Sequence, residues 1–535
     1  MQNHQRGDRL SWADTVFLHL EREGMPLNVA SVCVLEGEIP FLPYLRFVES
    51  KLPLLPRYLK RVVAPPFGIG LPSWEYDPTF KIRNHVRELT LQRGSDAELK
   101  AVAGRILSKV MDRQHPLWDL TLVHGLKGNR TGLIFRLHHC LADGIAGVGI
   151  MNVLFDTSPV TPRLPRKKLH LPIPRQRDPL TSLVSGVVDS YSDVVKRILS
   201  ALEDMLSMAE QVTANGGGNL PADQFSRLLP EITAFTERLR FNVNYRGPQK
   251  FTWTDVPLAD VKAIRQTCDA SVNDVILALM TATIRRYSEF HGDRVKGRLL
   301  RMMVPVNLRG NESPGELGNR ISLVPVTIPL DIRNPRKLLA AAHERTNFLK
   351  RVHAAELVSL AGGLIGFFPT SVQALAGPLV SQLPITPFNM VCTNVPGPQF
   401  PLYLLGHEMV RCYPYVPVGG EMAVNCAILS YNGTVYFGFS GDVHAAPDLG
   451  RLETFLQQSF AELRDAASGR SPQKKKKKKR VRTKAQDVST PTPAPAPAAT
   501  VHVPVPPRPP RPAVESAGVA EPITEDETLL AGVSA

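Results

Sequence analysis

A pair of expected strands that ends in two histidines constrains the fold of this chain more than any other segment. Residues 121–139 (TLVHGLKGNRTGLIFRLHH) predict two strands joined by a Gly-Asn turn. Side chains alternate between the two faces of a strand. One row of the second strand is mostly apolar and is expected to face inward: Leu133, Phe135, Leu137 and His139. By the same alternation, His138 points to the opposite face. The segment therefore predicts a sheet whose buried row ends at His139.

The seven residues His138–Gly144 (HHCLADG) predict the chemistry at this strand end. Histidine is the side chain best placed to take a proton near neutral pH. An aspartate can hold an imidazole in one tautomer or fix the backbone that carries it. Asp143 also stands where it would cap the helix-like stretch that follows, and Gly144 permits a sharp turn. The motif predicts a general base, His139, on a tight turn, with His138 in support.

Structural and catalytic alternatives exist for this motif. A satisfied core histidine and a simple N-cap would also explain His139 and Asp143, but their combination in one turn favours catalysis. Cys140 next to His139 could indicate a Cys-His nucleophile, yet adjacent side chains on a strand point apart. Residues 438–442 (GFSGD) fail the G-x-S-x-G pattern at the last position. No P-loop, HExxH or GxGxxG pattern is present either.

Length and composition predict a globular protein of two packed domains with accessory segments. The chain has 535 residues, of which 43% are hydrophobic. Its six cysteines are scattered without a CxxC pair, which favours a reducing compartment and argues against disulfides and a zinc site. The first residues lack the apolar core of a signal peptide, so we expect a cytoplasmic protein. The net charge of +14 suits CoA-type phosphates, anionic lipid surfaces or nucleic acid.

Other segments predict elements on both sides of the histidine motif. We expect strands near 27–37, 299–310, 322–330 and 434–443, a strand followed by a helix within 252–266, and helices near 41–52, 96–114 and 271–290. Two further helices are expected near 180–206 and 223–240. Residues 357–406 contain no charged side chain, and prolines and glycines interrupt them too often for a membrane span. They predict either a buried helix and strand or an amphipathic surface or acyl-chain tunnel near a membrane.

Composition changes divide the chain into four expected parts. A proline-rich basic stretch after Phe155 marks a crossover linker. The predicted parts are an N-terminal domain (1–155) with the histidine motif, a linker with a helical insert (156–244), a C-terminal domain (245–468) and a disordered Lys/Pro-rich tail (469–535).

The tail has three possible roles. It holds six consecutive lysines at Lys474–Lys479 and then a polyproline-like stretch. It is either a solubilising segment, a tether to an anionic membrane or a nonspecific contact for nucleic acid. The many apolar interior segments of the body favour the membrane over nucleic acid.

Motifs along the chain resemble those of the bacterial wax ester synthase/diacylglycerol acyltransferase family, part of the HHxxxDG CoA-dependent acyltransferases. HHCLADG matches the signature, and the likeness runs from about Asp8 to Ala467 in consistent order. The other matching blocks are DRLSWADTVFLHLE with Met25-Pro26-Leu27, Pro116-Leu117-Trp118, Ser271-Val272-Asn273-Asp274-Val275, Pro305-Val306-Asn307-Leu308-Arg309 with Gly318-Asn319, Asn394-Val395-Pro396-Gly397-Pro398, and SYNGTVYFGFSGD with Pro447-Asp448. The helical insert and the Lys/Pro tail depart from the family pattern.

The resemblance implies an α/β fold of two domains, with mixed sheets flanked by helices and an active-site channel between the domains. It implies acyl transfer from a fatty acyl-CoA to diacylglycerol or to a long-chain alcohol, with His139 as general base. Acyl-CoA is then a substrate, and no cofactor or metal is expected. The resemblance also implies peripheral association with the inner face of the cell membrane or with lipid droplets. A non-catalytic lipid-surface protein and a basic nucleic-acid binder are the rival interpretations, and neither has a motif of its own.

The remaining family blocks are expected to be structural. Asn273 and Asp274 open a helix, where N-capping explains the asparagine. Pro116-Leu117-Trp118 is expected to pack the domain and hold the following strand, and the NVPGP block predicts a turn. By analogy with related acyltransferases, Asp143 is expected to pair with Arg309 as a brace for the loop.

Overall fold

The computed structural model describes residues 9–65, 71–141, 151, 153–160, 237–307, 321–351 and 388–469. Asp143, Gly144 and Arg309 lie outside the described residues, as do the expected helix near 180–206, most of the helix near 223–240 and the tail from residue 470 on. The charge-free segment 357–406 lies outside them up to residue 387.

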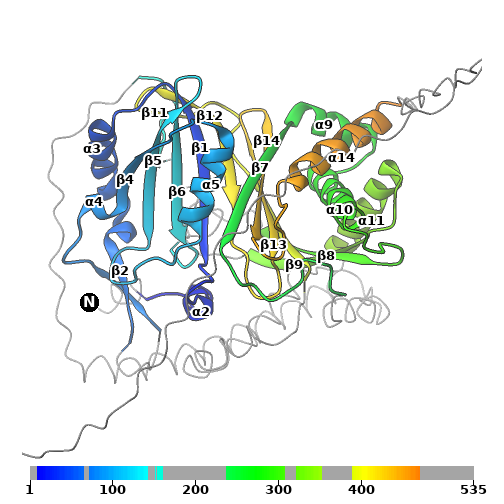
Figure 1. The fold of residues 1–535 in the computed structure, drawn as a ribbon, viewed down its shortest axis with the longest axis horizontal. Coiled ribbons are helices and arrows are strands. Elements are labelled where there is room, and N and C mark those ends of the chain that lie inside the picture. Colours follow the sequence, from blue (N-terminus) through cyan, green and yellow to red (C-terminus); the bar gives the residue numbers. More distant parts are fainter. Residues whose placement is uncertain are drawn as a thin grey trace, which may run out of the picture. The chain divides into compact units, whose positions relative to one another are not determined.

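Two six-stranded sheets organise the described residues (Figure 1). The first sheet has the strand order β11-β12-β1-β6-β5-β4 and is antiparallel except for the β4–β5 pair. Its strands are β1 (Asn28–Glu36), β4 (Val86–Thr90), β5 (Trp118–Leu126), β6 (Arg130–His138), β11 (Tyr403–Leu404) and β12 (His407–Tyr415). The expected hairpin is therefore present as β5 and β6, and Gly128 and Asn129 both take positive φ in its turn.

The second sheet has the order β7-β14-β13-β10-β8-β9, in which β10 runs parallel to both of its neighbours. Its strands are β7 (Gln249–Pro257), β8 (Leu299–Asn307), β9 (Ile321–Pro329), β10 (Met390–Pro396), β13 (Val424–Tyr431) and β14 (Thr434–Asp442). A short separate pair consists of β2 (Lys60–Val63) and β3 (Ser73–Tyr76). The NVPGP block was predicted as a turn, but its first three residues belong to β10, where they pair with β13.

Helices accompany each sheet, as expected for a mixed α/β fold (Figure 1). In the N-terminal half they are α2 (Trp12–Leu20), α3 (Phe41–Lys51), α4 (Ile82–His85) and α5 (Asp96–Leu107), with the 3₁₀ turns η1 (Leu52–Leu54) and η2 (Pro56–Leu59). In the C-terminal half they are α9 (Leu258–Thr267), α10 (Val272–Phe290), α11 (Pro335–Arg351) and α14 (Arg451–Ala467). Within the described residues, none of these helices combines the length and apolar character that a bilayer crossing requires.

The first sheet is completed by strands from the C-terminal half of the chain. Strand β12 pairs with β1 over most of its length and places Cys412 opposite Cys33. It also lies against β14 of the second sheet, where a Cβ atom at Gly438 would collide with the carbonyl oxygen of Pro414. Glycine is thus required for the two sheets to approach at this point. The predicted division at residues 155 and 245 stays a prediction, and strand pairing crosses it.

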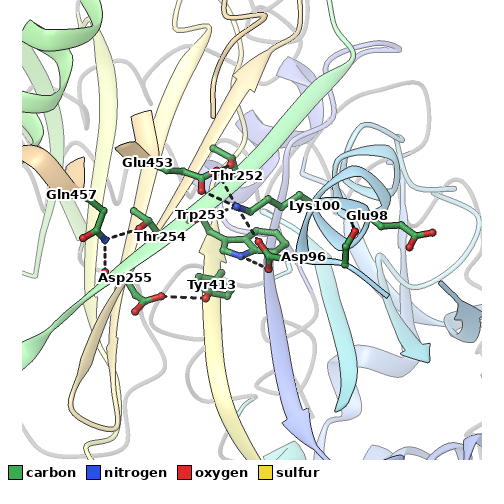
Figure 2. Close-up of polar contacts among 11 residues, drawn as sticks. Asp96, Glu98, Lys100, Thr252, Trp253, Thr254, Asp255, Tyr413, Glu453 and Gln457 are labelled. Atoms are coloured by element: carbon green, nitrogen blue, oxygen red, sulfur yellow. Dashed lines mark hydrogen bonds and ion pairs between the residues drawn. The ribbon is translucent and has the colours of Figure 1, made fainter. Parts of the chain in front are cut away.

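Helix α5 links the first sheet to the second (Figure 2). The ammonium group of Lys100 lies 2.9 Å from both carboxylate oxygens of Glu453 on α14. The indole Nε1 of Trp253 on β7 donates to Asp96 at the start of α5, at 3.1 Å. Tyr413 of β12 donates from its hydroxyl to Asp255 of β7 at 3.3 Å. Side chains from both halves therefore form one polar junction.

Candidate active site

The two histidines lie where β6 ends and turns away from the sheet. His138 is the last residue of β6, and its N–H donates to the carbonyl of Leu117 at 2.9 Å. The N–H of His139 donates to the carbonyl of Leu27 at 2.9 Å, and Leu141 N–H closes the turn on His138 O at 2.9 Å. Main-chain bonds to two neighbouring segments thus fix the backbone of both histidines.

Strand alternation was expected to turn His139 inward and His138 to the opposite face, and the structure does not follow this expectation. Strand alternation does not set the direction of His139, because this residue lies one position beyond β6. His138 is the more buried of the two, with no solvent exposure, whereas His139 is partly exposed. Both faces of β6 are buried, so an inward row could not be told from an outward row by polarity alone.

The ring of His139 stacks on Phe17 of α2, with centroids 3.8 Å apart and planes inclined by 16°. Burial lowers the pKa of His139 to about 4, and a hydrogen bond with its own main chain opposes this shift. His139 is therefore neutral at pH 7 and can accept a proton.

The two ring nitrogens of His138 have different partners: Nδ1 points toward the main chain of the turn, and Nε2 points toward the carboxylate of Glu21. Its Nδ1 accepts the main-chain N–H of Cys140 at 3.1 Å. Its Nε2 lies 3.4 Å from Oε1 of Glu21, a separation longer than a good hydrogen bond but short enough for electrostatic attraction in a buried site. His138 therefore contacts both the turn at residues 138–141 and the end of α2.

Glu21 is a buried acid that the sequence analysis did not identify as a site residue. Its Oε1 accepts the N–H of Leu27 at 3.1 Å, and its Oε2 accepts from the guanidinium of Arg113 at 3.0 Å. Burial alone would raise the pKa of this carboxyl, but His138, Leu27 and Arg113 together hold it below its ordinary value. The i, i+4 spacing places Phe17 and Glu21 on the same side of a helix, but it does not by itself identify Glu21 as a site residue.

Cys140 is buried, and burial raises the pKa of its thiol well above the ordinary value. A thiolate is the nucleophilic form of cysteine, and this site disfavours it. The environment agrees with the exclusion of a Cys-His nucleophile.

The Pro116-Leu117-Trp118 block makes packing contacts beside the turn at residues 138–141. Leu117 is fully buried, and its carbonyl holds the N–H of His138. The indole of Trp118 donates to the carbonyl of Tyr58 at 2.7 Å and stacks on His85, with centroids 4.7 Å apart. These are contacts of a structural element, and they brace the strand that leads to the histidines.

The N-cap of α10 is Ser271 and not Asn273, so the expected capping role of the asparagine is wrong. Ser271 and Asp274 form a reciprocal capping box, because each side chain accepts the other residue's main-chain N–H. Asp274 is fully buried and also accepts from His343 at 2.8 Å. Asn273 accepts from the amide of Asn394 at 3.5 Å, which brings two of the sequence blocks together.

Two family models match this chain. The model of the wax ester synthase/diacylglycerol acyltransferase catalytic domain matches residues 10–276. The model of the WS/DGAT C-terminal domain matches residues 317–464.

Curated relatives of similar length come from Mycobacterium tuberculosis. The protein tgs1, named as a probable diacylglycerol O-acyltransferase, is 27% identical over 469 residues, which cover 85% of this chain and 96% of that protein. The protein tgs2, with the same description, is 26% identical over 461 residues, which cover 85% of this chain and 98% of that protein.

Solved structures share the fold. A wax ester synthase/diacylglycerol acyltransferase from Marinobacter aquaeolei VT8 superposes with a TM-score of 0.60 at 22% identity, covering 86% of this chain and all of that chain. The first condensation domain of the calcium-dependent antibiotic synthetase superposes with a TM-score of 0.52 at 13% identity, covering 86% of this chain and 97% of that domain.

Proposed function

We infer that this chain, which belongs to the wax ester synthase/diacylglycerol acyltransferase family, is an O-acyltransferase that moves a fatty acyl group from acyl-CoA to a hydroxyl acceptor. The acceptor class is diacylglycerol, a long-chain alcohol or both. The observation that carries the chemistry is a neutral, stacked histidine at the start of an HHxxxDG motif.

His139 is proposed as the general base. Its Nε2 takes the proton of the acceptor hydroxyl while that oxygen attacks the thioester carbonyl. The tetrahedral intermediate then collapses, the carbon–sulfur bond breaks, and the imidazolium returns its proton to the CoA sulfur. The products are an oxygen ester and free CoA, and no covalent bond to the protein forms. Asp143 is proposed to pair with Arg309 and brace the loop, and Gly144 to permit its turn.

A direct assay tests this function. Purified protein is supplied with labelled palmitoyl-CoA and, in parallel, with diacylglycerol or hexadecanol, and the lipids are separated by chromatography. We expect labelled triacylglycerol, labelled wax ester or both. A fully folded protein that forms neither product would instead support a non-catalytic lipid-binding role.

The low pKa of His139 predicts an unusual pH profile. A general base works only when unprotonated, so kcat/KM should stay high below pH 6.5 and fall as the pH approaches about 4. Because the unfolded chain takes up this proton near pH 6.5, the fold also loses stability between pH 6.5 and 4. Initial rates should therefore be measured alongside circular dichroism at each pH. An acid limb at or above pH 6.5 with intact structure would contradict the assignment.

We propose that the protein associates peripherally with the inner face of the cell membrane or with lipid droplets. Residues 471–535 carry a net charge of +5, and clustered lysines attract anionic lipid surfaces. Deleting these residues should reduce sedimentation with phosphatidylglycerol vesicles, while turnover in detergent is retained. Raising the salt concentration should weaken the binding of the full chain to the same vesicles. Equal binding of both proteins to the vesicles would contradict a tether role for the tail.

A further inference from the structure

The end of α2 contacts the turn at residues 138–141, here called the catalytic turn because it carries the proposed base, through two side chains. Phe17 stacks on the ring of His139, and Glu21, one helical turn later, faces the ring of His138. Glu21 also binds the N–H of Leu27, whose carbonyl in turn binds the N–H of His139. The carboxylate of Glu21 is therefore connected to both histidines: directly to the ring of His138, and through Leu27 to the main chain of His139.

The hydrogen bond at Nδ1 determines the tautomer of His138. A nitrogen that accepts the N–H of Cys140 cannot itself carry a proton. The ring is then neutral, and its single proton sits on Nε2, the nitrogen that faces Glu21. In the opposite tautomer, two N–H groups would point at each other within the turn.

The surroundings of Glu21 keep it ionised. Arg113 and the N–H of Leu27 both donate to its carboxylate, which is itself without exposed side-chain surface. A carboxylate opposite Nε2 favours the tautomer with the proton on that nitrogen. A neutral side chain that donates at this position would favour the proton on Nδ1 instead.

We propose that Glu21, held by Arg113, is a positioning residue that locks His138 in the neutral Nε2–H tautomer, so that Nδ1 shapes the turn presenting His139. A neutral His138 also spares His139 a neighbouring positive charge when it becomes an imidazolium during the reaction. This role rests on the proposed acyl transfer, since it serves the base of that reaction.

Replacing Glu21 with glutamine tests the lock. Glu21→Gln removes the charge. With its oxygen kept toward the donor Arg113, its amide nitrogen takes the place of Oε1, where it donates to Nε2 of His138 and no longer accepts the N–H of Leu27. We expect kcat to fall between 10-fold and 100-fold, with KM changed less than 3-fold. The matched control is Glu23→Gln, an exposed acid two residues along, which should leave both constants unchanged.

Nitrogen-15 NMR of labelled histidines reads the tautomer directly, with the His138 signal assigned by its loss in His138→Asn. The Nε2–H signature of His138 should be present in the parent chain and lost in Glu21→Gln. Retention of that signature in the variant would overturn the proposal whatever happens to activity. A parent chain without acyltransferase activity would refute the proposed function, while the tautomer measurement would still decide the lock.

A second pair of variants tests the link to the turn. His138→Asn can place an amide oxygen where Nδ1 accepts the N–H of Cys140, whereas His138→Gln can place its nitrogen near Nε2 and loses that acceptor. We expect the asparagine variant to retain at least 10-fold more kcat than the glutamine variant. When Glu21→Gln is added to His138→Asn, kcat should fall less than 3-fold further, because an asparagine has no imidazole tautomer for Glu21 to select. Equal kcat values for His138→Asn and His138→Gln would contradict the proposal. So would a double variant in which the kcat losses of His138→Asn and Glu21→Gln simply multiply.

Discussion

Replacing His139 with alanine is expected to lower kcat for acyl transfer by about 1,000-fold, the contribution typical of a general base. The side chain is partly exposed and stacks on Phe17, so its removal should leave the fold intact. The rate is measured with saturating palmitoyl-CoA and acceptor, and folding is followed by circular dichroism and thermal melting.

His444→Ala provides the matched control for this experiment, because His444 is exposed and lies outside the catalytic turn. It should retain the parent rate. If His139→Ala kept more than one tenth of the parent kcat while folded, the general-base assignment would be wrong.

Replacing Arg136 with methionine is expected to reduce the free energy of unfolding by about 3–5 kcal/mol. Arg136 and its cross-strand partner Asp119 form a buried ion pair between β6 and β5. The same guanidinium donates to the carbonyls of Ile106 and Lys109 at the end of α5, at 2.7 and 2.8 Å. The variant would leave a buried carboxylate without its counter-charge. Denaturant titration of both proteins measures the difference.

Arg130→Met is the control for this second variant. Arg130 lies on the same strand and pairs with Glu36, but the two side chains are 35% and 45% exposed, respectively. Its loss should cost less than about 1 kcal/mol. Adding Asp119→Asn to Arg136→Met should recover part of the stability, since it removes the uncompensated charge. Similar losses for the two arginines would contradict the argument from burial.

Local patterns predicted the elements near the catalytic motif correctly. The expected strand at 27–37 is β1, and the expected hairpin at 121–139 is β5 and β6. Alternation and turn residues are short-range signals, so they suffice for such elements. The helix expected over 96–114 stops at Leu107, and the main-chain carbonyl of Lys109 just beyond it accepts from the side chains of Asn28 and Arg136 on the sheet.

Contacts between segments that lie far apart in the chain could not be predicted from the sequence. Glu21 and His138 are more than one hundred residues apart, and an acid at the end of an amphipathic helix usually lies in solvent. Its burial depends on Arg113, which no periodicity connects to it. The capping residue of α10 was misplaced for a smaller reason: Ser271 and Asn273 are both good N-caps, and only the backbone geometry distinguishes them.

The pairing of β12 with β1 has a consequence for synthesis of the chain. β1 is a nearly continuous apolar strand, and its free edge is covered only when residues 407–415 reach it. During translation, more than 370 residues must be made after β1 before this partner exists. Until then an open apolar edge is available for pairing with other chains, the situation in which nascent proteins aggregate or engage chaperones. The N-terminal sheet is thus finished only near the end of translation, and a fragment ending at the linker would carry an unprotected edge.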